Sequence, residues 1–216
     1  MTKENPMLDS ILSRTITDKD WIVDVITPSN PNAKHYTEQG SEWVSDSIDI
    51  REFVTQQNQV PHKEDVCGKA IAPINLLVGG KRKRDNIHTV NCLVYDIDKV
   101  SKDEVQSIFT KIEAMAFAVH TTFSNTIESL SLRLLIPVSR KIVANEFRLV
   151  WNWMASEVGE GIDQQCKDPS RQYLPPSSRI NSKAQCKVHA GGLLDIDKVL
   201  ELAKKKTLSV SPRQVR

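Results

Sequence analysis

The stretch from Asn91 to Val100, which reads NCLVYDIDKV, constrains this chain more than any other. A short apolar, strand-prone run, Cys92–Tyr95, ends abruptly at Asp96 and Asp98. Because side chains alternate along a strand, the two carboxylates are expected on the same side of a sheet. Like charges this close repel each other, which favours a cation between them, and hard oxygen ligands suit Mg²⁺ or Mn²⁺ better than zinc. A strand that simply ends in a polar loop is the alternative that this spacing leaves open.

The size and composition of the chain are those of an ordinary globular protein. Its 216 residues can form one sizeable core, or a core domain with a smaller attachment. No apolar run approaches a membrane span and the chain begins without the apolar segment of a signal peptide, so we expect a cytoplasmic protein with no membrane partner. Cys166, Cys186 and His189 match no standard zinc spacing.

Charge is distributed unevenly along the chain. Residues 1–66 carry 6 Lys and Arg against 12 Asp and Glu, a net charge of −6, whereas residues 67–216 carry 23 against 15, a net charge of +8. The basic part contains Asp96 and Asp98. A cationic surface around a carboxylate site suits a polyanionic substrate, such as a nucleotide or a nucleic acid strand, although lysines and arginines are also common on merely solvated surfaces.

This change in character predicts three parts: an N-terminal subdomain of unknown role at 1–66, a core at 67–206 and a flexible tail or linker at 207–216. Within the core, Gly79-Gly80 ends an apolar segment and is followed by a basic loop. Four cations gather there, at Lys81, Arg82, Lys83 and Arg84. Such a run is often a solvated hairpin tip, but its position before the aspartate strand favours contact with a phosphate backbone.

Beyond Asp98 the sequence predicts alternating helices and strands. Ser101-Lys102-Asp103-Glu104 is a capping box that starts a helix. Two strands are expected at 116–123 and 132–138, and two further helices at 142–158 and 195–206. Arg133, near the start of the second strand, needs an acidic partner or an anionic ligand if buried, and we favour the ligand.

A polar segment from Gly161 to Arg171 follows the long helix. Asp163 follows an apolar residue and is a candidate third carboxylate. Asp168, Ser170 and Arg171 are suited either to capping a helix or to holding a phosphate group.

Taken in order, these features resemble the primase-polymerases of plasmids and phages, a branch of the archaeo-eukaryotic primase superfamily. The resemblance spans roughly residues 70 to 200. It is carried by Asp96-Ile97-Asp98, by Thr121-Thr122-Phe123-Ser124, by Arg133 with Pro137 and Ser139-Arg140, and by Ile162-Asp163 with Asp168-Pro169-Ser170-Arg171 and Leu174-Pro175.

The resemblance implies an α+β fold whose catalytic core, residues 67–206, is built on an antiparallel or mixed sheet like that of an RNA-recognition motif. It also implies three acidic ligands for Mg²⁺ or Mn²⁺, namely Asp96, Asp98 and Asp163, with Asp168 in reserve. Two metals held in this way serve an in-line nucleotidyl transfer. Arg133 and Arg171 would then neutralise the nucleotide triphosphate.

One departure from the family pattern concerns the turn after residue 120. Related domains carry histidines in this turn, one of which contacts the incoming nucleotide, where this chain has Phe123 and Asn125. We expect His120, just upstream, or Asn125 to make that contact.

The leading hypothesis is a metal-dependent DNA primase or primase-polymerase of a plasmid, phage or other mobile element. It would take a single-stranded DNA template and NTP or dNTP, and would work with a helicase that is fused or separate. A non-catalytic replication-initiator or DNA-binding module of the same fold is one alternative. A metal-dependent nuclease that uses the same carboxylates is another.

Overall fold

The computed structural model describes residues 10–29, 42–63, 69–159 and 161–209 of the chain. The strands are β1 (Leu12–Thr15), β2 (Ile22–Pro28), β3 (Trp43–Asp49), β4 (Asn58–Val60), β5 (Ile74–Leu76), β6 (Ile87–Val100), β7 (Phe117–Thr121), β8 (Leu130–Val143), β9 (Ser177–Arg179), β10 (Cys186–His189) and β11 (Gly192–Leu194). The α-helices are α2 (Ile50–Thr55), α3 (Lys102–Lys111), α4 (Ala144–Val158) and α5 (Ile196–Ser209), and short 3-10 helices are η1 (Asp18–Trp21), η3 (Arg84–Asn86) and η4 (Gln164–Lys167).

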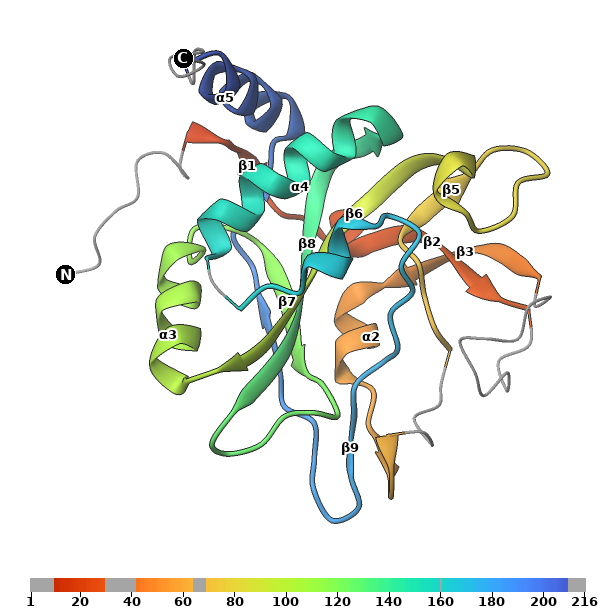
Figure 1. Ribbon diagram of the computed structural model, residues 1–216, viewed down its shortest axis with the longest axis vertical. Coiled ribbons are helices and arrows are strands. Elements are labelled where there is room, and N and C mark those ends of the chain that lie inside the picture. The colour runs from red at the N-terminus through yellow and green to blue at the C-terminus, as the bar shows by residue number, and fades with distance from the viewer. Residues whose placement is uncertain (1–9, 30–41, 64–68, 160, 210–216) are drawn as a thin grey trace, which may run out of the picture.

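The centre of the molecule is a seven-stranded sheet built on two long strands, β6 and β8. These strands pair antiparallel and twist together through the middle of the fold (Figure 1). β5 lies beyond β6, and β8 pairs with both β7 and β11 on its other side. Among the described strand pairs of this sheet, only β8–β11 is parallel. The predicted α+β class with an antiparallel to mixed sheet is therefore confirmed.

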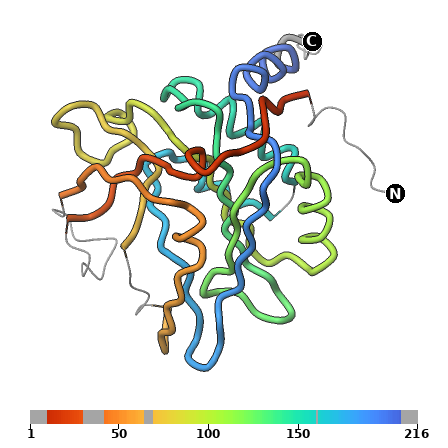
Figure 2. The backbone as a smooth tube through the Cα atoms, turned by 180° about the vertical axis from the view of Figure 1, so that it is seen from behind, coloured from red at the N-terminus to blue at the C-terminus, as the bar shows by residue number. Residues whose placement is uncertain are grey.

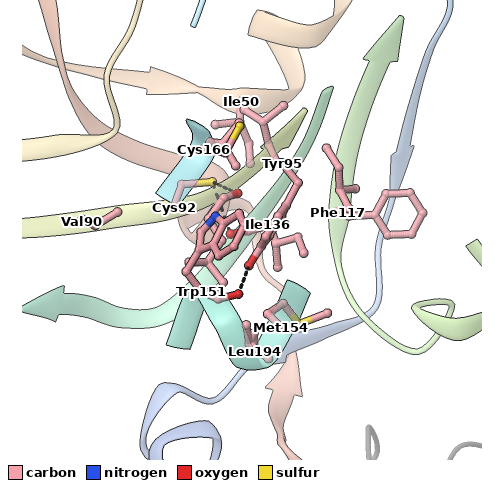
Figure 3. Close-up of a cluster of buried hydrophobic side chains, with 14 of the residues drawn as sticks. Ile50, Val90, Cys92, Tyr95, Phe117, Ile136, Trp151, Met154, Cys166 and Leu194 are labelled. Carbon is pink, nitrogen blue, oxygen red and sulfur yellow. Dashed lines mark hydrogen bonds between the residues drawn. The ribbon is translucent and has the colours of Figure 1, made fainter. Parts of the chain in front are cut away.

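One face of β6 is covered by α4, and this contact forms much of the core. The Tyr95 ring lies 5.1 Å from that of Trp151, and its hydroxyl donates a hydrogen bond of 3.1 Å to the Trp151 carbonyl (Figure 3). Both side chains are fully buried. Because strand side chains alternate, packing Tyr95 against α4 directs its neighbour Asp96 to the opposite face of the sheet.

The predicted helices form where their sequence signals place them. Ser101 accepts a hydrogen bond from the Glu104 amide and completes a capping box at the start of α3, as expected. The long predicted helix begins at Ala144, two residues later than expected, because β8 continues to Val143. α5 runs to Ser209 and so includes the first residues of the expected tail; residues 210–216 lie outside the described residues.

The described N-terminal residues pack into the same core as the rest of the chain. β1 pairs with β11, near the other end of the sequence, and the two run side by side in Figure 2. β4 pairs with β9, and Ile26 of β2 forms a bridge with Ala72. The expected subdomain boundary at residue 66 falls within residues 64–68, outside the described residues, and stays a prediction. None of the described helices has the length and apolar character that a membrane span requires.

Candidate active site

Three polar side chains lie in a row across the centre of the sheet. In the strand register, Asp96 of β6 faces Arg133 of β8, and Arg133 in turn faces His120 of β7. Residues directly opposite each other on neighbouring strands place their side chains on the same face. Arg133 donates from Nε to Asp96 Oδ1 at 2.7 Å and from Nη2 to Oδ2 at 3.1 Å, forming a bidentate ion pair.

This ion pair is buried, and it keeps Asp96 charged. Only 6% of the Asp96 side chain and 13% of the Arg133 side chain are exposed. Burial opposes the charge of Asp96, but the guanidinium of Arg133, helped by Arg171, more than offsets it and holds the pKa of Asp96 below its usual range. Arg133 also donates to the Leu174 carbonyl at 2.7 Å. From sequence, an anionic ligand was favoured over an acidic partner for Arg133. The structure shows an acidic partner, Asp96, and the nucleotide contact of Arg133 stays a prediction.

The polar segment after α4 brings Asp163 to this ion pair. The Asp163 amide donates to the Asp96 carbonyl at 2.8 Å, and the Asp98 amide donates to the Gly161 carbonyl at 2.9 Å. Gly161 permits the close approach, because its φ is +80° and a Cβ there would lie 2.6 Å from Val100 Cγ1. The first and last acidic motifs, 67 residues apart in sequence, thus meet at the end of β6.

Arg171 joins the two carboxylates. Its Nη2 donates to Asp96 Oδ2 at 3.1 Å, and its Nη1 forms an ion pair with Asp163 Oδ2 at 2.9 Å. Unlike Arg133, it is partly open to solvent, with 24% of its side chain exposed. A single cationic group therefore already lies between the two acids, where the sequence predicts a metal ion.

The donor set fits a hard divalent cation. Ligand atoms of Asp96, Asp163 and Cys166 all lie within 4.8 Å of one another. Burial raises the pKa of the Cys166 thiol to about 11, so the sulfur stays protonated near neutral pH and the effective donors are carboxylate oxygens. Mg²⁺ is commonly held by one or two carboxylates together with substrate phosphates. Asp96 and Asp163 therefore fit Mg²⁺ or Mn²⁺, provided that Arg171 moves aside.

Asp98 lies in the same cleft but apart from this compact group. The pairing of β6 with β8 is irregular between Ile97 and Val100, and Lys99 has a φ of 59°. Both acids line the cleft, as strand alternation predicts, but Asp98 is exposed where Asp96 is buried. Its role as a third metal ligand stays a prediction.

His120 presents a free acceptor at the base of the cleft. Its Nδ1 lies 2.9 Å from the Thr121 carbonyl, which can only accept, so Nδ1 carries the proton. Burial, and next the charge of Arg133, lower the pKa of His120 to about 3. The neutral ring leaves Nε2 as a buried acceptor with no hydrogen-bond partner among the described residues. Its expected contact with a nucleotide is therefore restricted to a donor group, such as a hydroxyl or a bound water.

Three other predicted nucleotide contacts are engaged in local structure. Asn125 accepts a hydrogen bond from the Ser131 amide at 3.1 Å and closes the loop between β7 and β8. Asp168 accepts from both the amide and the hydroxyl of Ser170, at 2.9 and 2.7 Å, and so stabilises the turn before Arg171. These three side chains lie outside the cleft lining, and their nucleotide contacts stay predictions.

The cleft itself has a volume of about 540 Å³, within the usual range for small-molecule sites. Its walls carry acids at the base and cations and an aromatic ring around them. The lining residues are Lys63, Arg82, Asp96, Asp98, His120, Thr122, Phe123, Ser124, Arg133, Gln165, Arg171, Gln172, Leu174, Pro175 and Ser177. The sequence did not indicate Lys63, which is distant in sequence from every motif, nor Cys166 beside Asp96.

The four cations of the basic loop lie in two different environments. Arg82 turns inward, where its guanidinium lies 4.5 Å from the Trp43 ring centroid and donates to the Ser170 carbonyl. Its buried Nε finds no acceptor among the described residues, and Arg82 lines the cleft. The other three cations, Lys81, Lys83 and Arg84, are exposed outside it.

The family of the chain follows from comparison with known proteins. The model of the VapE N-terminal domain matches residues 41–210, so the chain belongs to the VapE N-terminal domain family. Among solved structures, the chain is similar to the AEP domain of the primase-polymerase of cyanophage S-2L, with 12% identity, a TM-score of 0.48 and coverage of 92% of this chain and 93% of that one. It is also similar to primase RepB′, with 9% identity, a TM-score of 0.43 and coverage of 94% and 64%.

Comparison with curated protein sequences finds no match. Both solved structures are described as primases, the class of protein that the sequence resemblance predicts. At such low identity, neither solved structure assigns an activity to this chain.

Proposed function

We propose that this protein is a metal-dependent nucleotidyltransferase that synthesises primers on a single-stranded DNA template, as a primase or primase-polymerase of a plasmid, phage or other mobile element. The observation that carries the proposal is the shared cation position between Asp96 and Asp163, in a cleft whose lining also carries basic side chains and an aromatic ring. Phosphoryl transfer needs acids that can share a cation and nearby basic side chains that can bind phosphate oxygens, and this cleft has both.

In this proposal, Asp96 and Asp163 hold Mg²⁺ or Mn²⁺, assisted by Asp98 from the rim. A metal ion held there would supply Lewis-acid activation of a primer hydroxyl and would offset the charge that develops on the phosphates. Arg133 stays paired with Asp96 and keeps it ionised. The chain's own residues thus keep Asp96 charged before substrate arrives.

The remaining cleft residues bind the nucleotide. Arg171, once released from the carboxylates, and Arg82, with its unpaired Nε, donate to the triphosphate oxygens. Phe123 offers an aromatic face to the base. The substrates are NTP or dNTP and single-stranded DNA, and a fused or separate helicase is a further proposed partner.

The decisive experiment incubates the protein with a single-stranded template, labelled NTP or dNTP and Mg²⁺ or Mn²⁺, and resolves products by length. We expect products from the wild type and a loss of about a hundredfold or more in Asp163→Asn, because a metal ligand is removed. Asp163 is preferable to Asp96 for this test, since removing the buried Asp96 carboxylate would leave Arg133 uncompensated and impair folding. Glu128→Gln, which neutralises an exposed acid on the β7–β8 loop, is the control and should retain activity.

The other outcomes separate the alternative functions. Full activity of Asp163→Asn would contradict the metal assignment. A wild type that makes no product but binds DNA without metal would indicate a non-catalytic module, which the use of Asn125 to close its loop favours. Degradation of the template in the absence of nucleotide would indicate a nuclease.

A further inference from the structure

The loop between β5 and β6 carries an exposed apolar tip beside the basic loop. Leu77 is 48% exposed and Val78 is fully exposed. The loop projects from the edge of the sheet, in yellow in Figure 1, and the view from behind in Figure 2 agrees. Isolated apolar side chains on a surface are ordinary. Here, by contrast, two exposed apolar residues are adjacent at the tip of a projecting loop. Four cations follow them within a few residues.

The shape of this tip is fixed by the loop's own hydrogen bonds. The Gly80 amide donates to the Leu77 carbonyl at 2.8 Å and closes a tight turn around Val78. Gly79 has a φ of +72°, which an L side chain rarely adopts. The Leu77 amide donates to the Asn86 carbonyl at 2.7 Å and closes the base of the loop. Val78 is therefore held outward by a closed turn.

The charges on the loop indicate what the tip meets. Lys81, Lys83 and Arg84 are exposed, and they make no ion pair within the described part of the chain. Arg82, between them, enters the cleft that contains Asp96. The exposed cations therefore continue outward from the cleft, and a polyanion that reaches the cleft would run past them.

We propose that this tip, Leu77 and Val78 with Lys81, Lys83 and Arg84, binds the junction between duplex and single-stranded nucleic acid. The three cations hold the phosphate backbone, and the aliphatic tip packs on the exposed face of the terminal base pair. Apolar side chains that contact base faces beside basic residues are an established means of nucleic acid binding. The inference rests on the proposed function, because a primer end held near the cleft is where extension would occur.

The test measures binding alone, by fluorescence anisotropy without metal or nucleotide. The probes are a labelled single strand and the same strand annealed to a shorter complement with a recessed 3′ end. We expect the wild type to bind the junction more tightly than the single strand. Val78→Ser should lower that preference about fivefold, as partial burial of a valine side chain against the base pair predicts, and leave single-strand affinity within about twofold. Because Val78 is fully exposed, the substitution removes no core contact.

Two further variants serve as matched comparisons. The triple variant Lys81→Gln, Lys83→Gln and Arg84→Gln should weaken binding to both probes and reduce the slope of log affinity against log salt by about 2, at about 0.7 per phosphate contact. Ile127→Ser removes another exposed aliphatic side chain, 80% exposed on the β7–β8 loop, which carries no neighbouring cation. It should bind both probes like the wild type.

Several results would overturn the proposal. They are an absence of junction preference in the wild type, an unchanged preference in Val78→Ser, or an equal loss in Ile127→Ser. Val78-dependent binding to anionic phospholipid vesicles, without junction preference, would assign the tip to a membrane surface instead. If the wild type synthesises primers but Val78→Ser keeps the full preference for the junction, only the proposed role of this tip is contradicted. A Val78-dependent preference in a protein that makes no primers would contradict only the proposed chemistry.

Discussion

Removing Arg171 should strengthen the binding of a divalent cation, because its guanidinium occupies the position between Asp96 and Asp163. The substitution Arg171→Gln removes the charge and keeps a polar side chain of moderate length. In the wild type, a metal ion must break both contacts, at 3.1 Å and 2.9 Å, before it can bind the two carboxylates. In the variant, this competition is absent.

The size of the effect follows from those two contacts. Hydrogen bonds to charged groups contribute about 1.5 to 3 kcal/mol each when well buried. The Arg171 and Asp163 side chains are 24% and 23% exposed, so solvent screening reduces the value to about 1 kcal/mol for each contact. The two together correspond to about 2 kcal/mol, or about a thirtyfold lower Kd for Mn²⁺.

The measurement is a titration of metal-free protein with Mn²⁺, in which electron paramagnetic resonance reports the free ion. No nucleotide is present, so catalysis does not enter. Arg82→Gln is the matched control: it removes the same charge from the same cleft, but Arg82 contacts Trp43 and the Ser170 carbonyl rather than the two acids. We expect it to change the Kd less than about threefold, as a screened charge does.

Equal effects of the two substitutions would show that only the net charge of the cleft matters, and the proposed competition would be wrong. Weaker Mn²⁺ binding by Arg171→Gln would show that Arg171 orients the carboxylates for the metal instead of competing with it. Loss of the gain in the double variant Arg171→Gln, Asp163→Asn would connect the tighter binding to the predicted acid pair.

Two further predictions concern the interior. Arg133→Met should lower the free energy of unfolding by about 3 kcal/mol, measured in urea, because it leaves the Asp96 charge buried with one partner fewer; a loss below about 1 kcal/mol would contradict the buried ion pair. Alkylation of the native protein at pH 8 should label the exposed Cys186 and spare Cys92, since burial raises the pKa of the Cys92 thiol to about 12. Mass spectrometry would detect the adducts, and rapid labelling of native Cys92 would refute its burial.

The elements of this fold whose signals are local were predictable from sequence. The capping box at Ser101 and Glu104 starts α3 because both partners of each hydrogen bond lie within four residues. Gly159 ends α4 for the same local reason, with a φ of 108° that favours glycine. The start of α4 was two residues off, since pairing of β8 with β6 extends the strand to Val143.

The residue types of the site were predictable from sequence, but which of these residues contact one another was predictable only in part. The pairing of Asp96 with Arg133 and of Arg133 with His120 depends on strand register over 37 and 13 residues, which no local pattern specifies. Asp98 lines the same cleft as Asp96, as strand alternation predicts, but its exposure beside an irregular stretch of β6 could not be predicted from that pattern. Lys63 reaches the cleft from a segment with no motif.

The two arginines best show why chemistry cannot be assigned from residue type alone. From sequence, Arg133 and Arg171 are equivalent candidates for the triphosphate. In the structure, Arg133 uses three donor nitrogens on Asp96 and on a backbone carbonyl, at 13% exposure, so its release would leave a buried carboxylate without its main partner. Arg171 contacts the same carboxylate from the cleft side and is nearly twice as exposed. We therefore expect Arg133 to remain the counter-charge of Asp96, and Arg171 to be the arginine that exchanges the two acids for a phosphate group.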